Sequence, residues 1–158
     1  EPFVGTGEAF LHGITFAGHP VSCAVALGNL EIFEKEDICG HVRNNEDAFR
    51  TALEDLTDLP IVGDVRGAGY FYAIELVKDR ATRESFSDAE REHLLRGFFS
   101  NRLLELGLIC RADDRGEPVI QLSPPLISGP DDFAFISTIL RQALTEAMAE
   151  MERWSNAR

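Results

Sequence analysis

Residues 12–24 read HGITFAGHPVSCA and form a glycine-rich approach to a helix that we expect to begin near Pro20. Proline is favoured in the first turn of a helix, where its missing N–H needs no partner. Gly13 and Gly18 permit sharp backbone turns or the close approach of another group. Two interpretations follow. The stretch is either an ordinary approach to a tightly packed helix, or a loop in which Thr15 and nearby backbone N–H groups bind an anion such as phosphate.

The composition around this stretch is that of an ordinary globular protein, and it argues against several partners. The 158 residues are 44% hydrophobic and 27% charged, which is enough for a buried core. A formal net charge of −12 disfavours binding to nucleic acid or to an anionic membrane surface. No apolar run approaches the length of about 20 residues that spans a bilayer. We therefore expect neither nucleic acid nor a membrane as partner.

The cysteines and histidines indicate no metal site. Cys23, Cys39 and Cys110 are widely spaced and form no C-x-x-C pair, which argues against a disulfide framework and a structural zinc site. The histidines show no metal-ligand spacing either, and we expect a cytoplasmic protein. Residues 1–8 lack an initiator methionine and any periodicity. We therefore expect a sequence taken from the middle of a longer chain.

Downstream of Pro20, apolar residues at helical spacing predict one helix to about Phe33 and a second from about Ile38 to Leu56. The period then changes, because residues 61–67 and 69–77 are rich in β-branched and aromatic side chains. Glycines between these two runs indicate a turn, so the pattern predicts an antiparallel pair of strands. Beside that turn, Arg66 could bind a ligand or hold the turn by donating to backbone carbonyls.

A charged, solvent-exposed loop is expected over residues 78–85. The spacing of Ser87 and Glu90 is that of a capping box. It predicts a helix that ends at Gly107, the residue type favoured just after a helix. A strand over residues 108–111 and another over residues 118–122 are expected to form a second antiparallel pair.

A long helix from about Asp131 to Trp154 closes the chain, with Pro130 at its start. Its apolar side chains form one stripe that we expect to be buried: Phe133, Ile136, Ile139, Leu140, Leu144, Ala147, Met148 and Met151. The two methionines are expected to fill gaps in the core. The order of elements predicts an α+β arrangement.

Two residues are candidates for binding chemistry, since the common hydrolase, zinc-protease and phosphate-loop motifs are absent from the sequence. Thr15 is the first, because a hydroxyl before a helix suits a phosphate group. Arg111 is the second, because a guanidinium at a strand end can make a bidentate contact to a carboxylate. The alternative for Arg111 is an ordinary ion pair with Asp113 or Asp114.

Five segments, taken in order, resemble the C-terminal third of the class III aminotransferases: residues 13–21, 64–69, 73–83, 107–111 and 124–126. These are pyridoxal-phosphate enzymes that include the ω-amino acid:pyruvate transaminases. The resemblance covers nearly the whole chain. It implies fold type I and a homodimer with active sites at the subunit interface. It also implies that residues 1–58 end the large cofactor-binding domain and supply inter-domain helices. Residues 59–158 would form a small α+β domain, an antiparallel sheet packed with helices.

The resemblance assigns roles to the two candidate residues. Thr15 matches the threonine that binds the phosphate of the neighbouring subunit's pyridoxal 5′-phosphate, and Gly13 and Ile14 lie beside it. Arg111 matches a mobile arginine that pairs with a substrate carboxylate and swings away for apolar amines. The implied reaction transfers an amino group between an amine or ω-amino acid and a keto acid such as pyruvate.

The family's catalytic Schiff-base lysine lies upstream of the threonine motif, as do the groups that hold the cofactor ring. The only lysines of this chain, Lys35 and Lys78, stand in other contexts. We therefore expect no transamination by these 158 residues alone. A decarboxylase or aminomutase of the same fold, and a non-catalytic α+β interaction module, are the alternatives.

Overall fold

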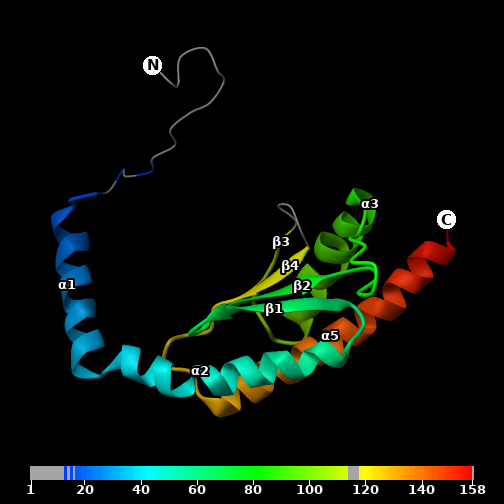
Figure 1. Cartoon of the computed structure of the whole chain (residues 1–158). Helices are drawn as coiled ribbons and strands as arrows, with labels where there is room; N and C mark the ends of the chain where they lie inside the picture. Colours follow the sequence, from blue (N-terminus) through cyan, green and yellow to red (C-terminus); the bar gives the residue numbers. More distant parts are fainter. Residues whose placement is uncertain (1–12, 14, 16, 114–117, 158) are drawn as a thin grey trace, which may run out of the picture. The chain divides into compact units, whose positions relative to one another are not determined.

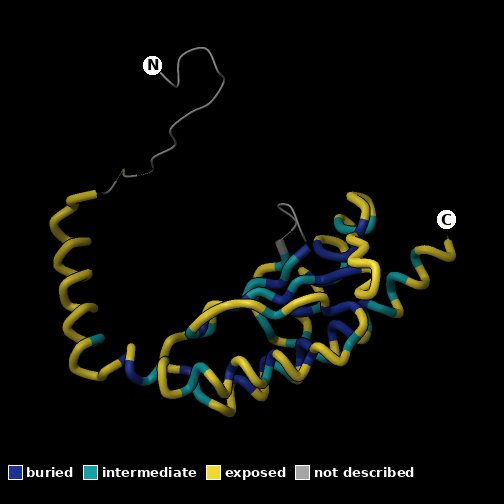
Figure 2. Tube along the Cα trace, viewed as in Figure 1, coloured by how far each residue is buried: buried dark blue, intermediate teal, exposed yellow. Residues whose placement is uncertain are grey.

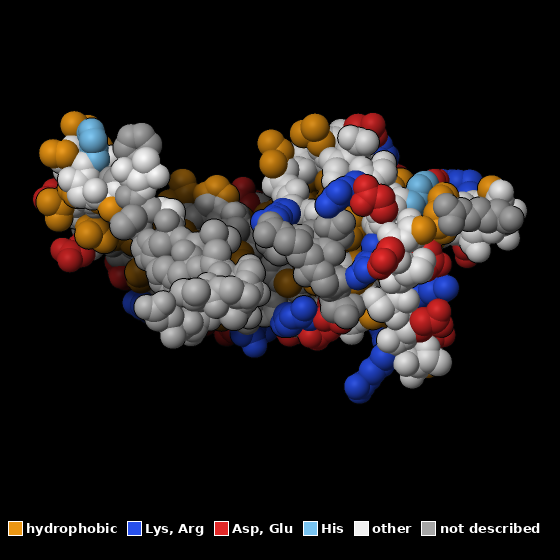
Figure 3. Space-filling model, turned by 90° about the horizontal axis from the view of Figure 1, so that it is seen from above, with side chains coloured by type: hydrophobic (Ala, Val, Ile, Leu, Met, Phe, Trp, Pro, Cys, Tyr) orange, Lys and Arg blue, Asp and Glu red, His pale blue; other side chains and the backbone are white. Residues whose placement is uncertain are grey.

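The computed structural model describes residues 13, 15, 17–113 and 118–157, and the chain divides into two units between Asp37 and Ile38. Helix α1 (Pro20–Lys35) accounts for most of the described part of the first unit (Figure 1). Pro20 occupies the first helical turn as predicted, and no residue of α1 is buried. Hydrophobic side chains of α1 lie on the surface instead (Figure 3).

The second unit begins with helix α2 (Ile38–Glu54), which continues into the short 3-10 helix η1 (Asp55–Asp58). The second predicted helix is therefore confirmed, and its last turn is the 3-10 helix η1. The inner face of this helical segment buries Phe49, Leu53 and Leu56, as the apolar spacing predicts.

The sheet of the second unit has four antiparallel strands in the order β1-β2-β4-β3. They are β1 (Val62–Ala68), β2 (Phe71–Leu76), β3 (Arg111–Asp113) and β4 (Val119–Leu122). The first predicted pair is confirmed, and β3 and β4 also pair antiparallel, with β3 displaced from its predicted position. The pairing of β2 with β4 joins them into one sheet, a contact between segments far apart in sequence.

The turn between β1 and β2 requires its glycines. Gly69 has φ of 56°, a left-handed conformation that glycine adopts without strain. A Cβ at Gly67 would clash with the carbonyl oxygen of Phe71, so a side chain there would force the backbone apart. Glu46 of α2 accepts a hydrogen bond of 3.0 Å from the Gly69 N–H and ties the turn to the helix.

Three consecutive helical segments run from Asp88 to Glu105: α3 (Asp88–Arg91), the π-helical η2 (Glu92–Phe99) and α4 (Ser100–Glu105). The predicted capping box is confirmed, since Ser87 and Glu90 exchange backbone-to-side-chain hydrogen bonds of 2.8 and 3.4 Å. The wide π turns were not predicted. Ser100 accommodates them by donating its hydroxyl to the Leu95 carbonyl at 2.9 Å.

The strand predicted over residues 108–111 is wrong in its bounds, because β3 begins only at Arg111 and continues to Asp113. Gly107 ends the helix with φ of 87°, as predicted. The N–H of Leu108 then donates back to the Leu103 carbonyl at 2.9 Å. Leu108 thus belongs to the cap of the helix, and its N–H is not available to a strand partner.

Helix α5 (Pro130–Asn156) packs with α2 and η2 on one face of the sheet (Figure 1). The predicted stripe is confirmed: its first six residues are buried, and Met148 and Met151 are partly buried against the core. Figure 2 shows burial concentrated between these helices and the sheet. None of the helices in the described part of the chain has the length and apolar character needed to cross a membrane.

Within the second unit, the described helices leave the other face of the sheet open (Figure 1). Along β2, Tyr72, Ile74 and Leu76 are buried while Phe71 is exposed, because successive strand residues point to opposite faces. The buried side carries an aromatic cluster in which Phe49 lies 4.8 Å from Phe133, measured between ring centroids. The open side carries the candidate site.

Candidate functional site

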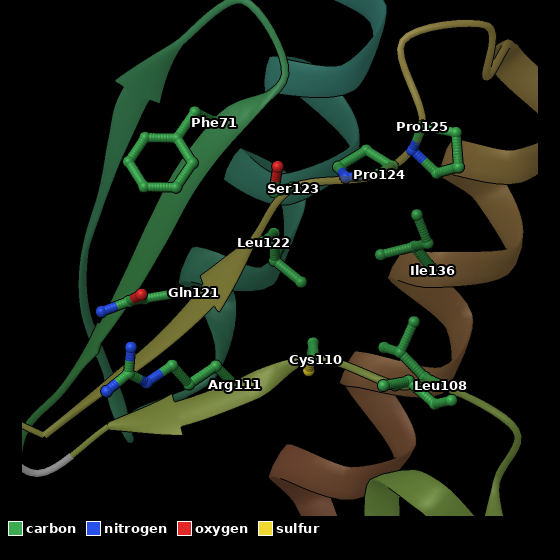
Figure 4. A pocket seen from close by; sticks show the side chains of 11 residues that line it. Phe71, Leu108, Cys110, Arg111, Gln121, Leu122, Ser123, Pro124, Pro125 and Ile136 are labelled. Atoms are coloured by element: carbon green, nitrogen blue, oxygen red, sulfur yellow. The ribbon is translucent and has the colours of Figure 1, made fainter. Parts of the chain in front are cut away.

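A hollow of about 520 Å³ lies where β3 and β4 meet the start of α5 (Figure 4). The segment before β3 and the loop after β4 complete its walls, and most of its lining is apolar. The lining residues are Phe71, Leu108, Ile109, Cys110, Arg111, Gln121, Leu122, Ser123, Pro124, Pro125 and Ile136. Phe71 reaches the hollow from the exposed face of β2.

Arg111 is exposed at the first position of β3, directly opposite Gln121 of β4. Figure 4 shows both side chains at the same end of the hollow. The alternative ion pair with Asp114 lies outside the described residues, as does the side chain of Asp113. Arg111 is the charged residue among the described residues that line the hollow.

Cys110 adds no charge to the hollow. Burial raises the pKa of its thiol to about 11, because desolvation disfavours the thiolate. The thiol is therefore neutral near pH 7 and is a poor nucleophile there. The chemistry that remains is an arginine beside an amide, with apolar walls around them.

Two hydrogen bonds hold the loop that forms one wall of the hollow. The Tyr70 hydroxyl donates to the Ser128 carbonyl at 3.0 Å, and His41 Nε2 lies 2.8 Å from the same oxygen. Within the loop, the Ser128 N–H donates to the Pro125 carbonyl at 2.9 Å. Burial raises the pKa of Tyr70, so its hydroxyl keeps its proton. Sequence reasoning missed this support because its partners lie 58 and 87 residues apart.

Arg66 does not hold the turn through backbone carbonyls, so that expectation is wrong. It donates to the carboxylate of Glu75 and forms an ion pair with Asp64 at 3.5 Å. The side chain projects from β1 opposite Ala73, where carboxylates on the same open face are its nearest partners.

The arginine that does bind backbone carbonyls is Arg80, in the loop expected to be merely charged and exposed. It donates to the carbonyls of Thr57 at 2.6 Å, Leu59 at 2.7 Å and Val62 at 3.0 Å. Arg80 thereby ties the loop after β2 to the segment that leads into β1. No local sequence signal marks this role, because the acceptors are main-chain atoms.

In the first unit, Gly13 and Thr15 are exposed, whereas Ile14 lies outside the described residues. Gly18 has φ of 76°, which confirms the sharp turn expected before the helix. His19, the N-cap residue of α1, makes no side-chain hydrogen bond to the first turn, whose N–H groups point toward the start of the helix. An exposed hydroxyl before a helix N-terminus suits the phosphate end of a cofactor.

Neither lysine is a candidate for the catalytic amine. Lys35 lies exposed in the last turn of α1. Lys78 is 3.2 Å from both Glu84 and Glu90, and these hydrogen bonds, the one to Glu90 first, raise its pKa. A lysine held as a charged ammonium is not a nucleophile.

Comparison with known proteins gives matches along most of the chain. A family model described as aminotransferase class-III matches residues 3–144. A probable aminotransferase of Mycobacterium tuberculosis is 58% identical over 146 residues, which cover 92% of this chain and 31% of that protein. The putrescine–pyruvate aminotransferase of Pseudomonas aeruginosa is 38% identical over 149 residues, 90% of this chain and 30% of its own length.

A solved structure of a PMP-bound aminotransferase from Vibrio fluvialis superposes with a TM-score of 0.76 at 31% sequence identity. The match covers 90% of this chain and 30% of that one. The chain therefore spans less than a third of the length of these relatives.

Proposed function

This chain belongs to the class-III aminotransferase family, and we propose that it forms the C-terminal part of a pyridoxal 5′-phosphate-dependent transaminase. The proposed parent enzyme moves an amino group between an amine or ω-amino acid and a keto acid such as pyruvate. The observation that carries this proposal is the position of Arg111. It brings a guanidinium to a hollow whose other described lining residues are uncharged and mostly apolar.

Arg111 is proposed to bind the substrate carboxylate. A guanidinium fork matches the two oxygens of a carboxylate, and apolar walls strengthen such a contact by excluding water. The apolar walls also suit the carbon chain between the carboxylate and the amine. Exposure of Arg111 at a strand end gives its side chain room to turn away when the donor is an apolar amine.

Thr15, with Gly13 and Ile14 beside it, is proposed to bind the cofactor phosphate of a neighbouring subunit in a homodimer. Its exposed hydroxyl and the N–H groups of the first turn of α1 are suitable donors, and the N-cap His19 side chain does not bond to that turn. When bound, pyridoxal 5′-phosphate supplies the electron sink for amino-group transfer. The related aminotransferase of Vibrio fluvialis was solved with PMP bound, which supports this choice of cofactor.

The same proposal assigns the two parts of this chain to different domains of the parent enzyme. Residues 1–58 would end the large cofactor-binding domain and supply inter-domain helices, and residues 59–158 would form the small domain. The catalytic lysine would come from a segment upstream of Thr15, so the chain alone would be inactive. Three unpaired cysteines favour a reducing compartment, and we place the enzyme in the cytoplasm.

The test uses the full-length parent enzyme with pyridoxal 5′-phosphate, an ω-amino acid and pyruvate. We expect visible absorbance from the bound cofactor and stoichiometric alanine. Arg111→Leu should raise the KM for the ω-amino acid by about 10- to 100-fold, the effect of losing a charged hydrogen bond. Arg96→Leu is the control, because Arg96 lies on η2 and pairs with Glu92 at 3.6 Å.

Two results would contradict the transaminase proposal and favour one of its alternatives. Turnover that consumes the substrate without forming alanine would favour a decarboxylase or aminomutase of the same fold. A full-length parent that binds no cofactor would favour the interaction module instead.

A further inference from the structure

One wall of the hollow is the loop of residues 123–129 between β4 and α5, which we call the wall loop. Its two consecutive prolines, Pro124 and Pro125, both line the hollow, and Figure 4 shows them on the stretch that leaves β4. Proline has no backbone N–H, so neither residue can donate a hydrogen bond that would fix its own position. The hydrogen bonds that hold this part of the wall therefore come from neighbouring residues.

Ser128 links the prolines to the core of the second unit. Its N–H donates to the Pro125 carbonyl at 2.9 Å, which closes a β-turn. Its own carbonyl accepts from the Tyr70 hydroxyl at 3.0 Å and lies 2.8 Å from His41 Nε2. Because a carbonyl oxygen only accepts, we assign the imidazole proton to Nε2. Hydrogen bonds thus connect two side chains of the core to the proline wall.

Packing fixes both donors. The Tyr70 side chain is 3% exposed, and its ring packs edge-to-face against Phe49 and Phe133, with centroid distances of 5.8 and 5.2 Å. His41 lies in the first turn of α2, with its ring edge-on to that of Tyr70 at 6.4 Å. A donor already fixed by packing loses little freedom when it forms a hydrogen bond. The core therefore determines where the Ser128 carbonyl lies.

The two donors share one acceptor. Ser128 is only 6% exposed, so water has poor access to its carbonyl. A carbonyl oxygen has two lone pairs and needs at least one donor when it is buried. A buried carbonyl with no donor carries the full cost of its desolvation. Loss of Tyr70 or of His41 alone should therefore be tolerated, whereas loss of both should release the wall loop.

We propose that Tyr70 and His41 are positioning residues that fix the wall at Pro124 and Pro125, and thereby set how strongly the enzyme distinguishes amino donors by the length of their apolar chain. The proposal rests on the proposed transaminase function. Neither Tyr70 nor His41 lines the hollow, so both act through the wall loop. A fixed apolar wall contacts each added methylene of a donor, which strengthens binding by about fourfold per methylene. A released wall loses part of this gain.

Hydrogen exchange of the full-length parent enzyme tests the hold on the wall loop without any substrate. Tyr70→Phe and His41→Leu each remove one donor and leave an apolar side chain in its place. The Ser128 amide should exchange no more than about threefold faster in either single variant, and at least about tenfold faster when the two are combined. His41→Gln should restore protection in the Tyr70→Phe background, because its amide nitrogen is also a donor.

Tyr72→Phe is the matched control. Tyr72 belongs to the same aromatic cluster, with its ring centroid 5.4 Å from that of Phe49, but its hydroxyl accepts from Arg50 at 3.1 Å. This variant should leave exchange in the wall loop unchanged, both alone and combined with His41→Leu. Unchanged exchange in the double variant of Tyr70 and His41 would overturn the proposal.

Two unbranched amines, 1-aminobutane and 1-aminohexane, test the effect on donor selection. They have no carboxylate, so the proposed contact to Arg111 does not contribute. Only the amine is added to the parent enzyme loaded with cofactor, and the change in the cofactor's visible absorbance reports the half-reaction. The ratio of the two half-saturating concentrations does not depend on the fraction of enzyme that is active. A loss of stability alone therefore leaves this ratio unchanged.

The wild-type enzyme should be half-saturated by the longer amine at a concentration about 10- to 20-fold lower, because two methylenes are added. This ratio should stay within about twofold in each single variant and in Tyr72→Phe, and fall to about threefold or less in the double variant of Tyr70 and His41.

Three kinetic results would overturn the proposal: a wild-type ratio near one, a double variant that keeps the wild-type ratio, or a parent enzyme that reacts with ω-amino acids but with neither amine. A parent enzyme that reacts with neither ω-amino acids nor amines would instead overturn the transaminase function on which the proposal rests.

Discussion

The two units of the chain differ in what they bury. Helix α1 is rich in apolar residues, yet Val21, Val25 and Leu27 are each more than 60% exposed and none of its residues is buried. The second unit encloses its own core between the sheet and α2, η2 and α5. An isolated helix of 16 residues is only marginally stable. Local signals therefore specify α1, whereas long-range packing stabilises the second unit.

The largest expected contrast comes from truncating one apolar side chain in each unit. Phe49 is fully buried, with ring centroids of Phe133 and Tyr72 at 4.8 and 5.4 Å. Phe49→Ala should lower the free energy of unfolding by about 3–5 kcal/mol. Leu27→Ala in α1 should change it by no more than about 0.5 kcal/mol. Urea unfolding followed by circular dichroism measures both. Similar losses in the two variants would contradict the contrast between the units.

A smaller effect should follow from removing a polar tie of the second unit. Arg80→Met keeps an apolar stem but loses the hydrogen bonds to the carbonyls of Thr57, Leu59 and Val62. Because these groups are partly exposed to water, the expected loss is about 1–2 kcal/mol of unfolding free energy. Arg83→Met, in the same loop, is the control and should be nearly neutral. A neutral Arg80→Met would mean that packing alone holds this segment.

The smallest effect concerns the ion pairs on the outside of the second unit. Arg102 donates to Glu146 at 2.5 and 3.0 Å, and these bonds lower the pKa of Glu146 from 4.5 to about 2. A carboxylate whose pKa is lowered by folding stabilises the folded state at pH values above its unfolded pKa. This stabilisation is lost as the pH falls through the pKa of the folded state. The contribution should therefore be complete above about pH 5 and disappear towards pH 2.

Melting curves of Glu146→Gln against the unmodified chain measure this contribution. The Tm difference should be about 1–3 °C at neutral pH and should close as the pH falls towards 2. Glu92→Gln serves as control, because Glu92 pairs with Arg96 at a looser 3.6 Å. A Tm difference that stays constant across this pH range would refute the assigned role of the pair.

The predictions that hold depend on neighbours in sequence. The capping box of Ser87 and Glu90 and the left-handed Gly107 each involve atoms within one turn of chain. Helix α5 follows from a repeated apolar spacing. The predicted start of β3 is wrong because the Leu108 N–H donates back to the preceding helix. The helix cap and the predicted strand both require this N–H, and the cap binds it.

The site was only partly predictable. Arg111 was selected from its residue type, its place at a strand end and a family resemblance, and its role stays a proposal, like that of Thr15. Gln121 was not selected, because its position opposite Arg111 depends on the register of β3 and β4. The support of the hollow by Tyr70 and His41 was also missed, since both bind the main-chain carbonyl of Ser128.

The sequence by itself determined where most of the helices lie, the capping box at Ser87, the glycine turns and the first strand pair, because each depends on backbone preferences and on apolar spacing over a few residues. Only the tertiary structure decided that β2 and β4 join the pairs into one sheet. It also decided that Phe71, Arg111 and Gln121 line one hollow, and that Arg80 binds three distant carbonyls. These contacts form between segments far apart in the chain. Their partners are selected by shape and by main-chain atoms, so the residue types in the sequence do not predict them.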